Sequence, residues 1–428
     1  MTKSLRLGIA GLGTVGVGVI KIIQKNLDLL SARAGKVIEI TAVCAKSRTK
    51  DRNVNLSGYA WEDDSIKLAR RNDVDVYVEL MGGEDGPAKA SVEAAIAAGK
   101  HVVTANKALL AHHGHVLASA AEVAGISLRF EAAVAGGIPI IKALTEGLAG
   151  NKIERIMGVM NGTCNYILTR MEDSGLPYSE IFEEANQLGF LEADPNLDVG
   201  GVDAAHKLVL LSSIAFGTQV NFSAAQLQGI GEISIDDITA AKGMGYRIKL
   251  LGLSQMTDKG LEQSMQPCLV PYNSPLGQLE GGTNMVVVEG DNIGQIVLRG
   301  AGAGEGPTAS AVMGDVIDIA RGISIPTFGI PAAQLTKAPA AQSTTPSAYY
   351  IRTSLRDAPG VLADIARGLG NSGVSIDRLR QQNHEGASAP ILIVTHPTEP
   401  SNIDKALSAI AATGETTSEP IALKIVEV

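Results

Sequence analysis

Apolar side chains in the first third of the chain recur at two alternating spacings. Short continuous apolar runs, typical of buried strands, are followed by stretches in which apolar residues return at helical spacing. The apolar runs lie at residues 5–10, 37–44, 73–80 and 101–105, and the helical stretches at residues 14–26, 87–98 and about 108–124. Strands and helices that alternate in this way form parallel sheets covered on both faces. The first 135 or so residues are therefore predicted to form a doubly wound α/β domain.

The pattern changes at residue 138, where longer helical stretches begin, and again where strands alternate with turn residues. The helical stretches lie at residues 138–148, 164–172, 178–188 and 202–216, and the later strands at residues 248–255, 261–270, 284–290 and 294–300. Such strands are typical of a mixed or antiparallel sheet, so this second domain is predicted to be α+β. A helix at residues 307–320 follows Gly302 and Gly304. We expect these glycines to bring the chain back toward the ligand of the first domain.

The last quarter of the chain begins with a segment that has few large apolar side chains. Residues 331–347 are rich in Pro, Ala, Ser, Thr and Gln, which is typical of a linker. After it, strand and helix patterns follow in the order βαββαβ, which predicts a small sheet backed by two helices.

Composition and charge narrow the class of protein. A length of 428 residues suggests about three domains, and 45% apolar residues suffice for buried cores. The net charge of −9 offers no basic excess for a phosphate backbone, so nucleic acid is not an expected partner. The three cysteines Cys44, Cys164 and Cys268 are far apart and odd in number, as in a reduced, cytoplasmic chain. No secretory leader or membrane-spanning run is expected.

The first candidate site is a glycine-rich turn between the first strand and the first helix. Gly11, Gly13 and Gly16 form G-x-G-x-x-G in the strand–turn–helix context of a Rossmann-type dinucleotide fingerprint. The first glycine permits a tight turn, the second lets a pyrophosphate approach, and the third lets helix and strand pack closely. The alternative is a purely structural glycine turn.

The end of the second strand bears on the choice of cofactor. An NAD site would place a carboxylate there, but the chain continues after Cys44 with Lys46, Arg48, Lys50 and Arg52. These cations can bind a 2′-phosphate through charge-assisted hydrogen bonds, which predicts a preference for NADP(H) over NAD(H). The alternative is a solvated basic loop that accepts both cofactors.

A cluster of carboxylates and one lysine provides a second candidate site. Residues 188–208 contain the ionisable side chains Glu192, Asp194, Asp198, Asp203 and Lys207. Asp203 and Lys207 are four residues apart on a predicted helix, so they share a face, and a buried carboxylate can prepare a lysine for proton transfer. The alternative is an ordinary surface ion pair beside a polar loop.

Three further groups have plausible structural explanations. Lys107 follows an apolar strand, at the sheet edge where such folds bind ligands, but an exposed lysine at a helix start would look the same. Cys164 could be a nucleophile, but packing explains it better because no histidine pattern accompanies it. His112, His113 and His115 do not share one helix face, so a metal site is not expected.

Taken in order, these motifs resemble the homoserine dehydrogenase family, in its long form with a C-terminal ACT domain. The motifs that carry the resemblance are GLGTVG (11–16), ELMGG (79–83), TANKALLA (104–111), EAAVAGGIP (131–139), NGTCNYILT (161–169), LEADPNLDVGGVDAAHKL (191–208) and GAGAGEGPTASAV (300–312). They span nearly the whole chain, and the segment from Glu192 to Lys207 is the most specific of them. The resemblance implies residues 1–137 as the NAD(P)-binding domain, completed by about 300–330, residues 138–300 as the substrate-binding and dimerisation domain, a linker at 331–347, and residues 348–428 as the ACT domain.

The resemblance also implies a reaction and the residues that perform it. Family members interconvert L-aspartate-4-semialdehyde and L-homoserine with NAD(P), on the route to threonine, methionine and isoleucine. By motif position Lys207 resembles the general acid/base and Lys107 a second catalytic or cofactor-contacting lysine. Glu192, Asp198 and Asp203 are the expected substrate carboxylates, with Glu192 and Asp203 expected to bind the homoserine amino group. The expected cofactor-binding residues are Gly11, Leu12, Gly13, Thr14, Val15, Gly16, Ala45, Arg48, Thr104, Lys107, Gly189, Gly302 and Gly304.

Two further expectations follow from the resemblance. Family members hold a monovalent cation, usually sodium, mainly through backbone carbonyls, and the matching positions are Glu131, Val134, Gly136 and Ile138. The turn at residues 355–362 resembles the amino-acid site of ACT domains, so L-threonine is the expected effector and a homodimer or tetramer the expected assembly. The alternatives are an ACT domain that only promotes oligomerisation, an aspartate-semialdehyde dehydrogenase that works through a cysteine thioester, and a non-catalytic amino-acid sensor that binds a dinucleotide.

Overall fold

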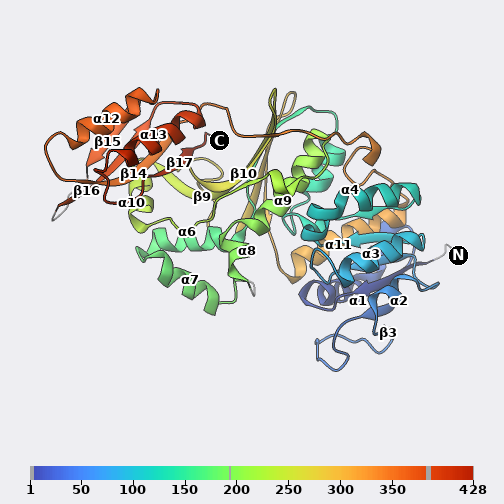
Figure 1. The fold of residues 1–428 in the computed structure, drawn as a ribbon. Coiled ribbons are helices and arrows are strands. Elements are labelled where there is room, and N and C mark those ends of the chain that lie inside the picture. The colour runs from blue at the N-terminus through green and yellow to red at the C-terminus, as the bar shows by residue number, and fades with distance from the viewer. Residues whose placement is uncertain (1–3, 192–193, 382–386, 428) are drawn as a thin grey trace.

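The computed structural model describes residues 4–191, 194–381 and 387–427, and its first unit is a parallel six-stranded sheet (Figure 1). The strands are β1 (Leu5–Ala10), β2 (Ile38–Cys44), β3 (Ala60–Glu62), β4 (Val76–Glu79), β5 (His101–Thr104) and β6 (Leu128–Arg129). Their spatial order is β3-β2-β1-β4-β5-β6, and every neighbouring pair is parallel. The order reverses between β1 and β4, and a doubly wound sheet binds its ligand beyond the carboxyl ends of the strands at this point.

Helices cover both faces of this sheet, as the continuous apolar strands predicted. One face carries α1 (Thr14–Ala34) and α11 (Glu305–Arg321), and the other carries α2 (Ser65–Ala69), α3 (Pro87–Ala97) and α4 (Lys107–Val123). The buried side chains of α1 and α11 form one cluster with β1. Gly18 allows the two helices to approach closely, since a Cβ there would lie 2.7 Å from the carbonyl oxygen of Glu305. A helix from much later in the chain therefore packs on the first domain.

The second unit is a mixed sheet that continues into the C-terminal strands. Its order is β12-β11-β7-β9-β10-β17-β14-β16-β15, with β8 and β13 also paired to β10. The strands before the C-terminal unit are β7 (Ile153–Val159), β8 (Gln226–Leu227), β9 (Tyr246–Thr257), β10 (Gly260–Pro271), β11 (Thr283–Gly290), β12 (Gly294–Ala301) and β13 (Ala340–Ala341). Strands β9 and β10 form a long antiparallel hairpin.

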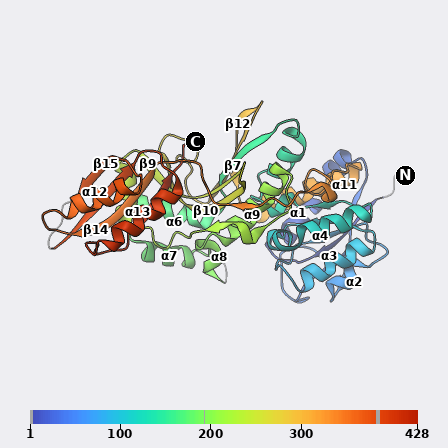
Figure 2. The ribbon, with the colours of Figure 1, turned by 45° about the horizontal axis from the view of Figure 1, so that its top comes forward.

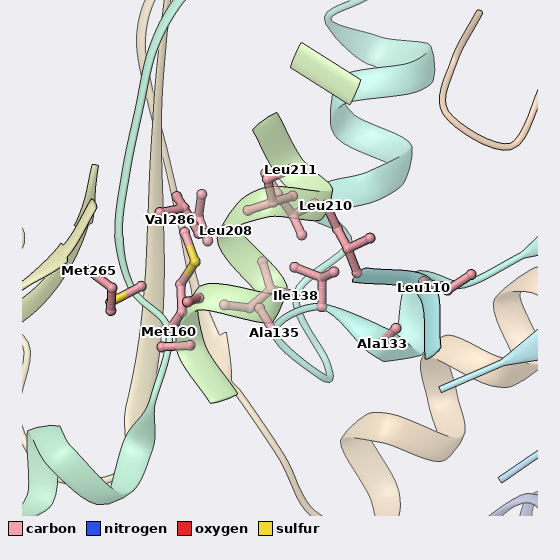
Figure 3. Packing of buried hydrophobic residues seen from close by; sticks show 14 of the residues in the cluster. Leu110, Ala133, Ala135, Ile138, Met160, Leu208, Leu210, Leu211, Met265 and Val286 are labelled. Carbon is pink, nitrogen blue, oxygen red and sulfur yellow. The ribbon is translucent and has the colours of Figure 1, made fainter. Parts of the chain in front are cut away.

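The second unit also contains six helices, of which α6, α9 and α10 pack against the sheet. They are α5 (Ile140–Lys142), α6 (Gly162–Ser174), α7 (Tyr178–Gln187), α8 (Pro195–Val199), α9 (Val202–Phe216) and α10 (Ile235–Gly243). Short 3₁₀ turns lie at Glu131–Ala133, Phe222–Ala224 and Ala332–Gln334, and a π-helical turn at Ala143–Gly147. In Figure 3, Leu208, Leu210 and Leu211 of α9 pack in one cluster with Val286 of β11 and with Met160, which directly follows β7. Helix α9 is therefore anchored in the core.

The C-terminal unit has the predicted βαββαβ order. Its elements are β14 (Tyr349–Arg356), α12 (Val361–Asn371), β15 (Ile376–Gln381), β16 (Ser388–Thr395), α13 (Pro400–Ala412) and β17 (Ile421–Ile425). Strand β17 pairs in parallel with β10, so this unit shares the sheet of the second one. Both views show the C-terminal unit at the end of the molecule opposite the N-terminal sheet, with the middle of the chain between them (Figure 2).

Several elements were missing from the sequence prediction. Strand β7 lies inside the second sheet, between β9 and β11, and helix α10 packs against β9 and α6. The predicted helix at 138–148 is instead a short α-helical turn followed by a π-helical one. Within the described residues, no helix has the length and apolar character needed to cross a membrane.

Candidate active site

The glycine fingerprint forms the predicted tight turn at the carboxyl end of β1. Gly11 has φ of 96°, and a Cβ there would lie 2.3 Å from the carbonyl oxygen of Leu80. A Cβ on Gly16 would lie 2.0 Å from the carbonyl oxygen of Gly11, whereas one on Gly13 would meet nothing within 4 Å. Gly11 and Gly16 therefore serve the turn and the strand–helix contact, while Gly13 leaves open space at the start of α1. A helix N-terminus beside open space is suited to an anion.

The basic loop after β2 is held against this turn by one of its own arginines. Arg52 donates to the carbonyl oxygens of Leu12 (3.0 Å), Lys50 (2.9 Å) and Ser47 (2.6 Å). Arg48 is exposed, and its guanidinium carbon lies 5.8 Å from the centre of the Trp61 ring. Arg52 therefore shapes the loop through the backbone, whereas Arg48 presents its charge to solvent next to the half-buried Ala45.

A cavity of about 550 Å³ lies between the first sheet and the second unit. Residues from both units line it, including Val15, Lys107, Gly136, Asn161, Gly189, Phe190, Asp198, Asp203, Lys207, Asn284, Gly302 and Gly304. The structure therefore brings together nine of the residues predicted from sequence. Thr104 lies behind the cavity, fully buried, where its hydroxyl donates to the Glu79 carboxylate at 2.6 Å. Glu192 lies outside the described residues.

Asp203 is the centre of the polar side chains in this cavity. Its Oδ1 lies 2.9 Å from Nζ of Lys107, and its Oδ2 lies 2.7 Å from Nζ of Lys207. The Asn161 amide also donates to Oδ2, at 3.2 Å. Lys207 makes a second hydrogen bond, of 2.8 Å, to the carbonyl oxygen of Met160. One carboxylate therefore holds two lysines that are 100 residues apart in sequence.

The electrostatics of this group depend on its burial. Burial by itself would raise the pKa of Asp203, but the ammonium groups of Lys207 and Lys107 outweigh it and hold the pKa well below its usual range. Asp203 therefore remains a carboxylate at neutral pH. The Lys207 side chain is only 11% exposed, whereas the Lys107 side chain is 29% exposed and keeps partial contact with water.

Asn161 links this ion-pair group to helices α6 and α8. Its Oδ1 accepts from the backbone N–H of Cys164 and so caps α6. Its amide donates to Asp198 Oδ1 at 2.9 Å as well as to Asp203. Sequence reasoning missed Asn161 as a site residue; an Asn near the start of a predicted helix signals a helix cap but does not indicate its contacts with Asp198 and Asp203. Phe190, stacked on Tyr166 at 4.4 Å, was missed too.

Cys164 is a packing residue in this structure. It is fully buried, and its thiol contacts the carbonyl oxygen of Asp198 at 3.3 Å. Burial raises the pKa of the Cys164 thiol well above its usual value, so the reactive thiolate is suppressed. This environment does not suit the thioester chemistry of a semialdehyde dehydrogenase.

Lys107 reaches the cavity because helix α4 begins there. The Asn106 side chain caps α4 by accepting from the N–H of Leu109 at 3.0 Å, and its amide donates to the carbonyl oxygen of Gly83. Lys107 is thus fixed in the first helical turn, beyond the carboxyl end of β5. It is an ion-paired lysine rather than a solvated one.

The predicted cation segment forms a buried turn beside the same cavity. Ala135 and Gly136 have φ of 54° and 50°, so two consecutive residues are left-handed. The Glu131 carboxylate accepts from the N–H groups of Ile141 and Lys142, which directs it toward α5. Burial, together with Asp315, raises the pKa of Glu131 to about 8. No cluster of three or more metal-ligating side chains occurs in the described part of the chain.

Two histidines lie beside surface carboxylates, and a third is buried against an aromatic ring. His112 lies 3.0 Å from Glu84, and His113 lies 3.0 Å from Asp85. His206 is buried against the Phe222 ring, with 4.4 Å between ring centres. Burial, followed by the nearby His112, lowers the pKa of His206 to about 4. These contacts are structural.

Comparison with known proteins gives a consistent result over the whole chain. Residues 139–317 match the family model described as homoserine dehydrogenase, residues 11–131 its NAD binding domain, and residues 349–415 the ACT domain. A homoserine dehydrogenase of Neisseria gonorrhoeae is 44% identical over 422 residues, covering 96% of each chain. The crystal structure of a homoserine dehydrogenase from Thiobacillus denitrificans has a TM-score of 0.94, 38% identity and 99% coverage of each chain. A hyperthermophilic archaeal homoserine dehydrogenase mutant in complex with NADPH has a TM-score of 0.63 and 26% identity, covering 74% of this chain and 97% of its own.

Proposed function

The chain belongs to the homoserine dehydrogenase family, and from this premise we propose that Lys207 is the general acid/base of an NADP(H)-preferring enzyme that L-threonine inhibits. It is an NAD(P)-dependent oxidoreductase with a C-terminal ACT domain. The proposed reaction interconverts L-aspartate-4-semialdehyde and L-homoserine. The observation that carries the proposal is the Asp203 carboxylate, which holds Lys107 and Lys207 in one cavity with the fingerprint residue Val15.

Lys207 is well placed to transfer a proton to or from the substrate oxygen. Two of its ammonium protons are directed to Asp203 and Met160, which leaves the third for a group in the cavity. In reduction, the Lys207 ammonium donates a proton to the aldehyde oxygen and becomes a neutral amine, and in oxidation the neutral amine takes the proton of the homoserine hydroxyl. The bound nicotinamide would supply or accept the hydride. Lys107 adds a second positive charge near the developing alkoxide.

The carboxylates divide between two tasks in this proposal. Asp203 already holds both lysines, so it chiefly positions the acid/base. Asp198 is buried and lines the same cavity, with its carboxylate oriented by Asn161. Glu192 and Asp198 are therefore the proposed partners of the homoserine amino group, with Asp203 contributing negative charge nearby.

The proposed preference for NADP(H) rests on the loop after β2. Arg48 is exposed beside Trp61, and its charge can pair with the 2′-phosphate that NAD lacks. The NADPH complex of the archaeal relative supports this choice. The pyrophosphate would lie at the start of α1, over Gly11, Leu12, Gly13, Thr14, Val15 and Gly16, and Gly189, Gly302 and Gly304 would line the nicotinamide side.

A monovalent cation fits the turn at residues 131–138. In the described residues, no hydrogen bond reaches the carbonyl oxygens of Val134 or Gly136, although both residues are buried. Glu131, Val134, Gly136 and Ile138 would hold the ion through backbone oxygens, as an oxygen-preferring cation requires. The ion would stabilise the turn that lines the cavity.

Steady-state kinetics of the purified full chain test these proposals. L-Homoserine oxidation should proceed with a higher kcat/KM for NADP⁺ than for NAD⁺, should rise along a sodium series at fixed ionic strength, and should fall as L-threonine is added. Equal kcat/KM for the two cofactors would reject the role of Arg48. A flat sodium series would reject the functional ion, and rates unchanged by L-threonine would leave the ACT domain with a role in assembly only.

A further inference from the structure

A lysine that does not line the active-site cavity is buried in the second sheet. Lys249 lies on β9 and is 2% exposed. Its ammonium donates to Oδ1 of Asn165 at 2.8 Å and to the carbonyl oxygen of Leu279. Both acceptors are neutral, and Lys249 forms no ion pair within the described parts of the chain. A charge buried among neutral groups costs free energy, so stability is a poor explanation of this lysine.

Lys249 keeps its charge at neutral pH. Burial, followed by the nearby charge of Arg247, lowers the pKa of Lys249 to about 8. This pKa is still above 7, so the side chain remains mostly an ammonium with three donors. Glu172, Glu280 and Asp173 oppose the shift, but the first two pair with Arg247, at 3.0 Å each, rather than with Lys249.

Both partners of Lys249 belong to the contact between helix α6 and the chain that links β10 to β11. We name this link, residues 272–282, the connecting segment. The amide of Asn165 on α6 donates to the carbonyl oxygen of Gly281 at 2.7 Å, and to that of Leu279 at 3.4 Å. Asn165 is 1% exposed and Leu279 is fully buried. The ammonium of Lys249 therefore bonds to one residue on each side of a buried contact.

A second cation of β9 holds the connecting segment nearer its start. Arg247 is two residues before Lys249, so the two side chains share one face of the strand. Its guanidinium donates to the carbonyl oxygen of Gly277 at 2.9 Å and lies over the Tyr272 ring, 4.4 Å from its centre. Arg247 thus anchors the first part of the segment, and Lys249 anchors its end.

The end of the connecting segment forms part of the wall of the active-site cavity. Gly282 lines the cavity beside Gly162 and Thr163 of α6 and beside Phe190. The backbones of Gly162 and Gly282 are in contact, since a Cβ on Gly162 would lie 2.6 Å from the carbonyl oxygen of Gly282. A Cβ on Gly282 would lie 3.6 Å from the Phe190 ring. A shift of the segment away from α6 would therefore widen the cavity at this wall.

This wall lies on the side of the cavity that we assign to the substrate. Asn161 begins α6 and donates to Asp198 and Asp203, of which Asp198 is a proposed partner of the homoserine amino group. The fingerprint residue Val15 lines the cavity from the first unit. A displaced segment should therefore disturb the binding of homoserine more than that of the dinucleotide.

We propose that Lys249 is a positioning residue, which holds the connecting segment against α6 and so fixes the cavity wall that binds L-homoserine. This inference rests on the proposed function, because it takes its substrate from there. Lys249 acts through Asn165 and Leu279, since it does not line the cavity itself. Without the ammonium, both acceptors lose a donor and the segment is free to shift. Part of the substrate's binding energy is then used to order the wall.

Steady-state kinetics of the full chain test this role. Lys249→Met keeps an unbranched apolar side chain but removes the ammonium. The KM for L-homoserine should rise at least about tenfold, while the KM for NADP⁺ changes less than about twofold and kcat falls less than the homoserine KM rises. Asn165→Ala should have a similar effect. The double variant should be no worse than the stronger single variant, because both side chains act through one contact.

Ile410→Ala is the control for a merely structural effect. Ile410 is fully buried in the core of the C-terminal unit, so its truncation destabilises the protein at a place remote from the connecting segment. It should lower the melting temperature and leave the KM for L-homoserine unchanged. Hydrogen exchange at residues 277–284 should be faster in Lys249→Met and Asn165→Ala than in the wild type, and unchanged in Ile410→Ala.

The outcomes separate this proposal from the proposed function. Faster exchange together with a raised KM for L-homoserine supports the proposal. If a folded Lys249→Met variant shows unchanged exchange at residues 277–284, or an unchanged KM for L-homoserine, the proposal is wrong. If Lys249→Met does not fold, Asn165→Ala decides by the same two measurements. If the wild type does not oxidise L-homoserine, the proposed function fails, and the exchange rates alone decide whether Lys249 holds the segment.

Discussion

Replacement of Asp203 by Asn should damage stability and catalysis together, because one carboxylate serves two ammonium groups. The substitution keeps the shape of the side chain but removes its charge, so Lys107 and Lys207 lose their shared partner at 2.9 and 2.7 Å. Removal of one partner from a buried ion pair costs about 3–5 kcal/mol. Lys107 is partly exposed and recovers some hydration, so we expect a loss of unfolding free energy near 3 kcal/mol. Since ~1.4 kcal/mol corresponds to a tenfold change, kcat/KM should fall at least about 100-fold if similar energy is lost from the transition state.

Urea unfolding and homoserine oxidation would be measured on this variant and on Asp364→Asn. Asp364 is the control because it forms an exposed ion pair with Arg367 on α12, for which a change within about 1 kcal/mol is expected. The native pKa of Asp203 is depressed, so the wild type loses this contribution only as the pH falls below about 4. The stability difference between wild type and Asp203→Asn should therefore shrink in that range. If Asp203→Asn matched the wild type in stability and rate at neutral pH, the two-lysine arrangement would have no functional meaning.

Three further predictions concern the cofactor site and the buried histidine. Arg48→Ala should weaken NADP(H) binding about 10- to 100-fold relative to NAD(H) binding, as expected for the loss of a charge-assisted hydrogen bond. If fluorescence titrations showed an unchanged ratio of the dissociation constants for the two cofactors, this prediction would be wrong. Gly11→Ala should lower the melting temperature of the free protein, because the added Cβ would clash with the backbone. Gly13→Ala should leave the melting temperature unchanged but weaken cofactor binding. Equal effects of the two variants would argue against a structural role for Gly11 and a cofactor-binding role for Gly13. The pKa of His206 is lowered from 6.5 to about 4, so the unfolded chain takes up a proton in that interval that the native chain does not, and stability falls as the pH falls. Between pH 7 and pH 5 the His206→Gln variant should lose about 2 kcal/mol less unfolding free energy than the wild type. Replacement of the exposed His396 by Gln should not reduce this loss.

The first domain was predictable because its signals are local. Strands β1, β2, β4 and β5 lie within the predicted apolar runs, and the fingerprint glycines stand between β1 and α1, whereas the short strands β3 and β6 were not predicted. Strand β7 was missed because Glu154 and Arg155 interrupt its apolar pattern. In the fold Arg155 pairs with Glu289 on the neighbouring strand β11, so a charged residue is accommodated inside a sheet. That partner is distant in sequence and gives no local signal.

The side-chain contacts within the candidate site were predictable only where the two residues share an element. Asp203 and Lys207 are four residues apart on α9, so their contact follows from helix geometry. The contact of Asp203 with Lys107 depends on how the first sheet and α9 are packed, which periodicity does not reveal. Lys107 alone was indistinguishable from an exposed lysine at a helix start. Asn161 was overlooked for the same reason, because its bonds to Asp198 and Asp203 form only in the folded chain.

The most direct test of the central claim is the rate of L-homoserine oxidation by Lys207→Ala under NADP⁺ saturation, measured beside the wild type. The variant should remain folded and bind NADP⁺ normally, since the cofactor would bind at the fingerprint turn. Its kcat should fall by about 10²–10⁴-fold, the usual contribution of a positioned acid or base. Near-normal kcat in a folded Lys207→Ala variant would contradict the assignment of Lys207 as the acid/base.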